Sequence, residues 1–319
     1  MTSRSNIMDA VEWRAGSTDL SERRRTGISR GPITDLIPTP EMREILVVAG
    51  EGARIGSSVT LEAIGADKRL AKTYPGIAAT VKLLATPQIR HVATLGGNLA
   101  QRSRCWYFRN PNISCLKKGG SDCPARAGNH YYGVAFDLGP CIAPHPSSMA
   151  TALLAYDATI RTDRRDGLTL DALYGDGSNG SLDHRLEPGE VIISIDLPPA
   201  ATSEFATYER AISRAQAEWP LVEIAARIIV KDARFQLVRL VAGGIAPVPL
   251  RLVGAEKAAK DALAETDIFT IAAKAAIEGA KPMPMSAYKL KLLEGLVYDV
   301  LEQCAEASAG VWIDKSIPS

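Results

Sequence analysis

From about residue 12 to residue 60, short apolar runs alternate with glycine and proline, which is the pattern of strands joined by tight turns. Strands are predicted in VEWRAG, PITDLIP and EILVVAGEGARIGSSVTL, and the last run is expected to form a hairpin with Glu51 and Gly52 at its tip. From Thr60 to Leu84 the apolar residues recur at helical spacing instead. This segment predicts two short helices, the first capped by Thr60 and the pair divided by Pro75.

The second half of the chain mixes both periods again. HPSSMATALLAYDATIRT predicts a helix that is capped by Ser147 or Ser148 and runs into a strand. LEPGEVIISIDLP and FQLVRLVAGGIAPVPLR have strand character and are separated by WPLVEIAARIIVKD. Helical spacing returns at residues 255–276 and 286–306, with two prolines between them.

These elements predict an α+β protein with a boundary near residues 200–206, where the polar, proline-containing stretch PPAATSE lies. We expect one α+β domain at residues 1–203 and a second at 204–319. A length of 319 residues is ample for two such cores. The polar cluster GDGSNGSLDH at residues 175–184 predicts a mobile loop.

Composition narrows the classes of partner. The 37 basic residues nearly balance the 36 acidic ones, which gives no support to a nucleic-acid partner. The longest apolar runs contain charges and fall short of a membrane span, so no membrane insertion is expected. The N-terminus lacks the apolar segment of a secretory signal, which predicts a cytoplasmic protein unless a partner subunit carries it out of the cell.

Two segments bring small residues to places where a backbone can approach a ligand. AGSTDL at residues 15–20 follows a predicted strand, and ATLGGNL lies at residues 93–99. Consecutive exposed N–H groups in such loops form a concave nest that suits phosphate oxygens. Neither segment matches a known phosphate-loop pattern, so tight turns without a ligand and a nucleotide site both remain open.

Four of the five cysteines are Cys105, Cys115, Cys123 and Cys141. No C-x-x-C pair is present, and spacing alone leaves free thiols, an iron–sulfur cluster and structural zinc open. The segment between these cysteines is poor in aliphatic residues and needs something to hold it together. The fifth, Cys304, is expected to be a core thiol in the last helix.

The residues around these cysteines favour the cluster. Five basic side chains could offset the charge of four thiolates: Arg102, Arg104, Arg109, Lys117 and Lys118. Gly119 and Gly120 could leave N–H groups free to donate to sulfur. The simpler interpretation of Lys-Lys-Gly-Gly is a solvated turn.

Several motifs occur in the same order as in one known protein family. PQIRHVATLGGNLAQRSRCWYFRN, CLKKGG, CPARAGNHYYGVAF, HPSSMATALLAYDA, WPLVEIAARI and VAGGIAPVPLR closely resemble the FAD-binding subunits of the xanthine dehydrogenase family of molybdenum hydroxylases. Within that family the chain resembles the branch with an extra [4Fe-4S] loop, as in the β subunit of 4-hydroxybenzoyl-CoA reductase and the flavin subunit of the periplasmic aldehyde oxidoreductases. The resemblance covers roughly residues 12–310.

The resemblance implies a fold and a set of site residues. The fold is a two-subdomain FAD-binding domain of the PCMH type, followed by a C-terminal domain of the CO dehydrogenase flavoprotein type with a three-stranded sheet and helices. Four cysteines would ligate a [4Fe-4S] cluster in a loop at about residues 101–145: Cys105, Cys115, Cys123 and Cys141. The first FAD loop would comprise Ala15, Gly16, Ser17, Thr18 and Asp19. The second would comprise Thr94, Gly96, Gly97 and Asn98, with Ser147 near the ribityl chain.

Several positions depart from the family pattern, among them Arg210, where a lysine is usual, and Ala217, where an aromatic residue is usual. Ser17 stands where a second glycine is usual, and Ser148 stands where an aspartate usually follows His-Pro-Ser. Both changes affect the expected FAD site and leave the cysteine motif intact.

The resemblance implies an electron-transfer subunit that carries FAD and one [4Fe-4S] cluster. Its partners would be a large molybdopterin subunit and a small [2Fe-2S] subunit. The alternatives are a cluster-only relay or scaffold that has lost FAD, and a structural module with zinc. No residue is expected to be catalytic toward substrate, because the four histidines have no paired carboxylate or second histidine beside them in the sequence.

Overall fold

The computed structural model describes residues 11–215 and 217–310. The first ten residues, on which the expectation about an export signal depends, lie outside this range. The helices and strands before residue 110 are β1 (Glu12–Arg14), α1 (Leu20–Arg25), β2 (Ile33–Asp35), η2 (Glu41–Arg43), β3 (Ile45–Val48), β4 (Gly52–Gly56), α2 (Leu61–Ala66), α3 (Lys68–Thr73), α4 (Pro75–Leu83), α5 (Pro87–Arg90), α6 (Leu95–Leu99) and α7 (Trp106–Arg109).

The remaining elements alternate short helical turns with the longer strands and helices of the C-terminal half. They are η3 (Leu116–Lys118), η4 (Pro124–Arg126), α8 (Ser148–Ala155), β5 (Thr159–Thr162), β6 (Leu168–Thr169), α9 (Leu170–Tyr174), β7 (Ile192–Leu197), β8 (Phe205–Ala211), β9 (Val222–Lys231), β10 (Arg234–Gly243), β11 (Leu250–Arg251), α10 (Val253–Ala259), α11 (Thr266–Ala275), η5 (Pro284–Ser286) and α12 (Tyr288–Ser308).

Three sheets organise these elements. Strands β1 and β2 pair in parallel, a five-stranded sheet has the order β3-β4-β7-β5-β6, and a four-stranded sheet has the order β11-β10-β9-β8. The predicted hairpin is confirmed, but its tip is wrong in part, because Gly52 already belongs to β4 and pairs with Val48. The segment at 221–231, to which no strand was assigned, forms the central strand β9, because its apolar residues pack on both faces.

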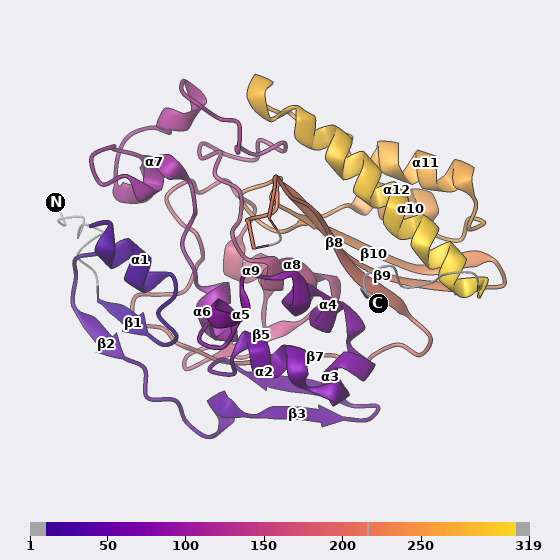
Figure 1. The fold of residues 1–319 in the computed structure, drawn as a ribbon, viewed down its shortest axis with the longest axis horizontal. Helices are drawn as coiled ribbons and strands as arrows, with labels where there is room; N and C mark the ends of the chain where they lie inside the picture. Colours follow the sequence, from indigo (N-terminus) through magenta and orange to yellow (C-terminus); the bar gives the residue numbers. More distant parts are fainter. Residues whose placement is uncertain (1–10, 216, 311–319) are drawn as a thin grey trace.

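Helices α4 and α8 lie between the two larger sheets. Every residue of α8 is buried, and Met149 and Leu153 share one core with Ile160 of the five-stranded sheet and Val241 of the other. A second core lies between the four-stranded sheet and helices α10–α12, and it includes Cys304, whose expected place in the core is confirmed (Figure 1). Residues from both halves of the chain therefore fix the position of α8.

Capping residues explain which predicted helix boundaries the structure confirms and which it does not. The Thr60 and Ser147 caps are confirmed, since each hydroxyl accepts a backbone N–H of the helix that follows. The prediction of two helices at 60–84 is wrong: Asp67 caps an additional one, α3. The helical character expected at 255–276 is confirmed, but it is divided into α10 and α11, because the chain breaks after α10 and Asp261 adopts a left-handed φ of 63°.

Residues 101–145, which we call the cysteine lobe, form an irregular region around α7 that lies beside α1 (Figure 1). One segment of the lobe is attached to the C-terminal half. The N–H groups of Ala135 and Phe136 donate to the carbonyl of Ile245, and Ser286 Oγ donates to the carbonyl of Val134. No helix in the described part of the chain is long and apolar enough to cross a membrane.

Candidate functional site: two glycine loops and a four-cysteine cavity

The first glycine loop, residues 15–19, connects β1 to α1 and keeps its donors free. Ser17 adopts a left-handed φ of 62°, the conformation that its place in a glycine-type loop requires. Among the described residues, the backbone N–H groups of residues 15–20 have no hydrogen-bond acceptor. Successive free N–H groups around a left-handed residue form an anion-binding nest.

The backbone of this loop lies directly against the segment that leads into the second loop. A Cβ atom on Gly16 would overlap the carbonyl oxygen of Val92. Glycine is therefore required at position 16 for a close backbone approach, and the structure brings the two predicted loops together.

The second loop, by contrast, uses its N–H groups within the protein. Gly96 N donates to Ser57 O at 2.8 Å, Asn98 N donates to Thr94 O, and Gly97 N donates to Thr94 Oγ1 at 3.2 Å. This loop is thus the capped first turn of α6. The side chain of Asn98 accepts a hydrogen bond from Ser147 Oγ at 2.7 Å, which joins the loop to the start of α8.

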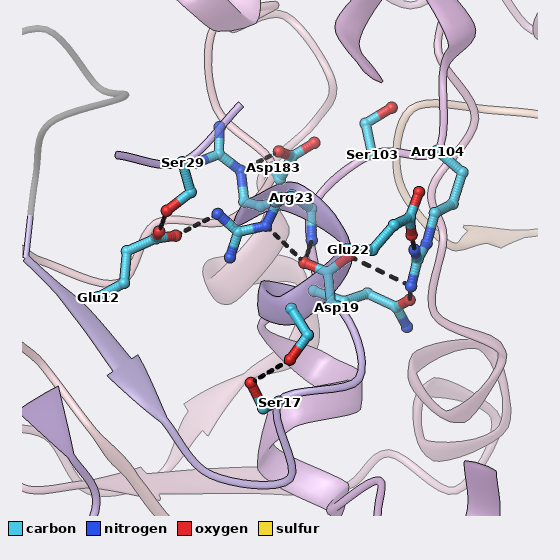
Figure 2. Close-up of polar contacts among 12 residues, drawn as sticks. Glu12, Ser17, Asp19, Glu22, Arg23, Ser29, Ser103, Arg104 and Asp183 are labelled. Carbon is cyan, nitrogen blue, oxygen red and sulfur yellow. Dashed lines mark hydrogen bonds and ion pairs between the residues drawn. The ribbon is translucent and has the colours of Figure 1, made fainter. Parts of the chain in front are cut away.

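Asp19, expected in the FAD loop, directs its carboxylate away from the nest. It accepts from Arg23 Nε at 2.8 Å, from an Arg109 nitrogen at 2.7 Å and from the Arg102 backbone N–H at 3.2 Å, and it pairs with Arg104 at 3.2 Å. Burial alone would raise the pKa of Asp19, but the guanidinium groups outweigh it and hold the pKa below its usual range. Figure 2 shows Asp19 among these arginine contacts.

A second buried carboxylate extends this network toward the cysteines. Asp183 pairs with Arg102 and, at 2.8 Å, with Lys117, and its side chain is only 4% exposed. Burial opposes ionisation, yet the two cations hold the pKa of Asp183 well below its usual range. The polar cluster at residues 175–184, expected to be a mobile loop, is therefore anchored at its end.

All four predicted cysteine ligands line one small cavity: Cys105, Cys115, Cys123 and Cys141. Three of them stand immediately before a short helical turn, at α7, η3 and η4. The apolar groups around the cavity form only two small clusters, one of them Ile28, Phe108 and Cys115. In the described part of the chain, no three His, Cys, Asp or Glu side chains converge closely enough to hold one metal ion.

Backbone N–H groups of the following turns surround the sulfur atoms. Burial raises the pKa of Cys105 and Cys115, while N–H groups of the turns that follow them oppose that rise. Cys123 and Cys141 share a hydrogen bond, and that bond makes Cys123 the more acidic partner. Such donors are the usual outer contacts of metal-bound thiolates.

The expectation for the Lys-Lys-Gly-Gly stretch is wrong in two respects. Lys117 is only 6% exposed, so the stretch is not simply a solvated turn. The N–H groups of Gly119 and Gly120 donate to the carbonyls of Leu116 and Cys115, not to sulfur. Gly119 instead adopts a left-handed φ of 86° and ends the η3 turn.

An open, largely apolar pocket lies between the cysteine lobe and the start of β9, and it includes Cys105, Ser148, Trp219 and Glu223 in its wall. Glu223 is 2% exposed and accepts hydrogen bonds from Ser148 at 2.6 Å, Thr151 at 2.9 Å and Tyr208. Burial raises its pKa against the effect of these hydroxyl groups.

Glu223 was not among the site residues expected from the sequence. The available signal was a glutamate at an inward position of an apolar strand.

Two family models match this chain. Residues 8–200 match the FAD binding domain in molybdopterin dehydrogenase, and residues 206–304 match the CO dehydrogenase flavoprotein C-terminal domain. These matches confirm the expected two-part α+β fold, although the C-terminal sheet has a fourth, two-residue strand, β11, beyond the expected three.

The chain is also similar to curated relatives. It is 33% identical to the aldehyde oxidoreductase FAD-binding subunit PaoB of Escherichia coli (strain K12), over 83% of this chain and 81% of that protein. It is 21% identical to the xanthine dehydrogenase FAD-binding subunit of Escherichia coli O157:H7, over 87% of this chain and 82% of that protein.

Solved structures share its fold. Quinoline 2-oxidoreductase from Pseudomonas putida 86 matches with a TM-score of 0.72 and 19% identity, covering 93% of this chain and 90% of that one. Carbon monoxide dehydrogenase from Hydrogenophaga pseudoflava matches with a TM-score of 0.70 and 18% identity, covering 95% and 91%.

Proposed function

This chain belongs to the family of FAD-binding domains in molybdopterin dehydrogenases, whose relatives here are subunits of oxidoreductases, and on that premise we propose that it is the electron-transfer subunit of a heteromeric molybdenum hydroxylase. It would hold FAD and one [4Fe-4S] cluster. Its partners would be a large molybdopterin subunit and a small [2Fe-2S] subunit.

The nest in the first glycine loop is the observation that carries the FAD assignment. Six consecutive backbone N–H groups, residues 15–20, have no acceptor among the described residues, and the FAD pyrophosphate provides oxygens that could accept from them. Ser147 donates a hydrogen bond to Asn98 of the second glycine loop, and its neighbour Ser148 lines the open pocket. The start of α8 therefore connects that loop to the pocket. We therefore place the ribityl chain near Ser147 and the flavin ring in the pocket.

When bound, FAD supplies the exchange of one or two electrons, and the chain's own residues hold it and shield it. Gly16 allows the two loops to meet, while Thr94 caps the helix that supports the second loop. Glu223 fixes the start of α8 through Ser148 and Thr151.

For the cysteines, the proposal of a [4Fe-4S] cluster is supported by the single small cavity that all four thiols line. The N–H groups that follow Cys105, Cys115 and Cys123 suit cluster thiolates. A cluster-only relay is the second candidate, because Ser17 and Ser148 depart from the usual FAD site.

Cofactor analysis of the anaerobically purified full-length chain tests this function. We expect one FAD released by acid per chain, and about four iron atoms with a broad absorbance that dithionite bleaches. Cys123→Ser should lose the iron, while the control Cys304→Ser should keep it, since Cys304 is buried in α12 within the C-terminal core.

Three outcomes would count against parts of this assignment. A colourless protein would overturn both cofactors. Iron without flavin would favour the cluster-only relay, and zinc in place of iron would favour the structural module.

A further inference from the structure

We propose that Asp19 is a positioning residue that couples the two cofactor sites, so that filling the four-cysteine cavity strengthens FAD binding and FAD in turn strengthens retention of the cluster. This inference rests on the proposed function.

The hydrogen-bond and ion-pair partners of Asp19 connect the first glycine loop to the cysteine lobe. It ends the first glycine loop, yet it makes no side-chain hydrogen bond to cap α1. Three of its four donors belong to the cysteine lobe: the Arg102 backbone N–H, Arg104 and Arg109. The position of the FAD loop is therefore set by a segment whose sequence lies more than 80 residues away.

A second acidic residue on the same side reinforces this contact. Glu22 of α1 pairs with Arg104 and, at 3.5 Å, with Arg109. Asp19 and Glu22 thus share two arginines: Arg104 directly precedes Cys105, and Arg109 ends the α7 turn that follows it. Figure 2 shows Arg104 beside Asp19 and Glu22. Movement of that turn would displace both arginines at once.

The network also reaches the wall of the cysteine cavity. Arg102 pairs with Asp183, and Asp183 in turn pairs with Lys117. Lys117, which follows Cys115 and precedes Cys123 in the sequence, lines the cysteine cavity. Arg102 and Lys117 are both largely buried in these pairs, with side chains 18% and 7% exposed. Buried pairs transmit displacement because neither partner can be left alone without a large desolvation cost.

The order of this region depends on what the thiols hold. From residue 101 to 130 the described lobe contains only α7, η3 and η4, each of three or four residues. Its apolar clusters are small, and one of them includes Cys115 itself. Such a segment gains its fixed geometry from a bound group, as in other small metal-stabilised folds.

Coupling of this kind is reciprocal. If an ordered lobe places the arginines on Asp19, an occupied cavity favours the loop geometry that binds FAD. Thermodynamic linkage then requires FAD to favour the occupied cavity by the same factor.

A double-mutant cycle on the full-length chain tests this inference, with FAD affinity measured from flavin fluorescence. We expect Cys115→Ser to weaken FAD binding about tenfold, within the usual range of coupling between sites. Asp19→Asn should weaken it by a similar factor, and the double variant should be no weaker than either single variant, because each change breaks the same connection. Glu190→Gln is the matched control: this buried carboxylate also pairs with an arginine, Arg165, but it lies outside the lobe.

A second measurement keeps the test decisive if Asp19→Asn does not fold. The rate at which a chelator removes iron from the wild-type chain should be about tenfold slower with FAD bound than without it. Unchanged FAD affinity in Cys115→Ser, a double variant in which both losses multiply, or iron release that ignores FAD would overturn the coupling alone. A wild-type chain that holds no iron would overturn both the coupling and the proposed function.

Discussion

The two glycine loops look alike in sequence and differ in what their backbones do. Each combines glycine with a nearby threonine, and the sequence alone leaves a tight turn and an anion-binding nest open for both. The first keeps its N–H groups free around Ser17, whereas the second uses the N–H groups of Gly96, Gly97 and Asn98 to build the first turn of α6. The difference teaches that the fate of each N–H group, not the number of glycines, decides which loop can bind an anion.

The loops also differ in how they are supported. The first is held by the buried charges around Asp19. The second is held by hydroxyl and backbone contacts, and behind it Tyr174 donates to the carbonyl of Leu99 and packs against His145. Substitutions and pH should therefore affect the two loops differently.

The largest effect is expected at Gly16. Gly16→Ala should destabilise the protein by about 3 kcal/mol or more and abolish FAD binding, because the new Cβ would meet backbone atoms that cannot move aside. Gly96→Ala should cost less, since its Cβ would meet the Ser57 side chain at 2.9 Å. Urea unfolding and FAD affinity measure both, and equal losses would mean that the loops are equivalent.

Acid should act on the support of the second loop through His145. Burial, together with the neighbouring Lys117 and His184, lowers the pKa of His145 to about 3, so the folded state keeps it neutral while the unfolded chain gains a proton below about pH 6.5. Through His145 alone, stability should thus fall by about 2 kcal/mol between pH 6.5 and pH 5. Burial also lowers the pKa of His184, to about 4, and this residue adds to the same slope. Asp19 stays ionised at pH 5, because its pKa is lowered from its usual range.

His145→Phe provides the control for this pH dependence. It keeps an aromatic ring against Tyr174 and removes two ring nitrogens that have no partner among the described residues. Unfolding midpoints between pH 7.5 and 5 should then show a flatter slope, and an unchanged slope would assign the effect to another group.

The smallest effects are expected at the hydroxyl residues. Thr94→Val removes the cap of α6 and should cost about 1 kcal/mol. Ser17→Gly removes a left-handed non-glycine residue but adds freedom to the unfolded chain, so stability should change by less than about 1 kcal/mol while FAD still binds. Thermal unfolding of the two variants measures both changes in stability. A loss of FAD binding in Ser17→Gly would show that the serine side chain itself is needed.

Local signals predicted much of this structure. The Thr60 and Ser147 caps, the hairpin before them and the position of Pro75 at the start of α4 all follow from residues next to each other in sequence. The break after α10 and the additional helix α3 depend on single residues, Asp261 and Asp67, that a periodic pattern does not weigh.

The contacts within the site could not be predicted in the same way. The sequence pattern grouped four cysteines, and the structure places all four around one cavity. It could not indicate that Asp19 faces arginines of the cysteine lobe, or that Lys117 pairs with Asp183, since these partners are distant in sequence and meet only in the folded chain. The sequence pattern also could not indicate which backbone N–H groups of the two glycine loops are free and which are hydrogen-bonded within the protein.

The attachment of Val134, Ala135 and Phe136 to the C-terminal half has a consequence for biosynthesis. These residues lie between Cys123 and Cys141, and they are held by Ile245 and Ser286. The ribosome makes those holding residues long after the cysteines, although domains generally fold from the N-terminus as they emerge. The cavity of the four thiols is therefore completed only after Ser286 has been synthesised, so any group that these thiols bind can be held in its final geometry only late in the synthesis of the chain.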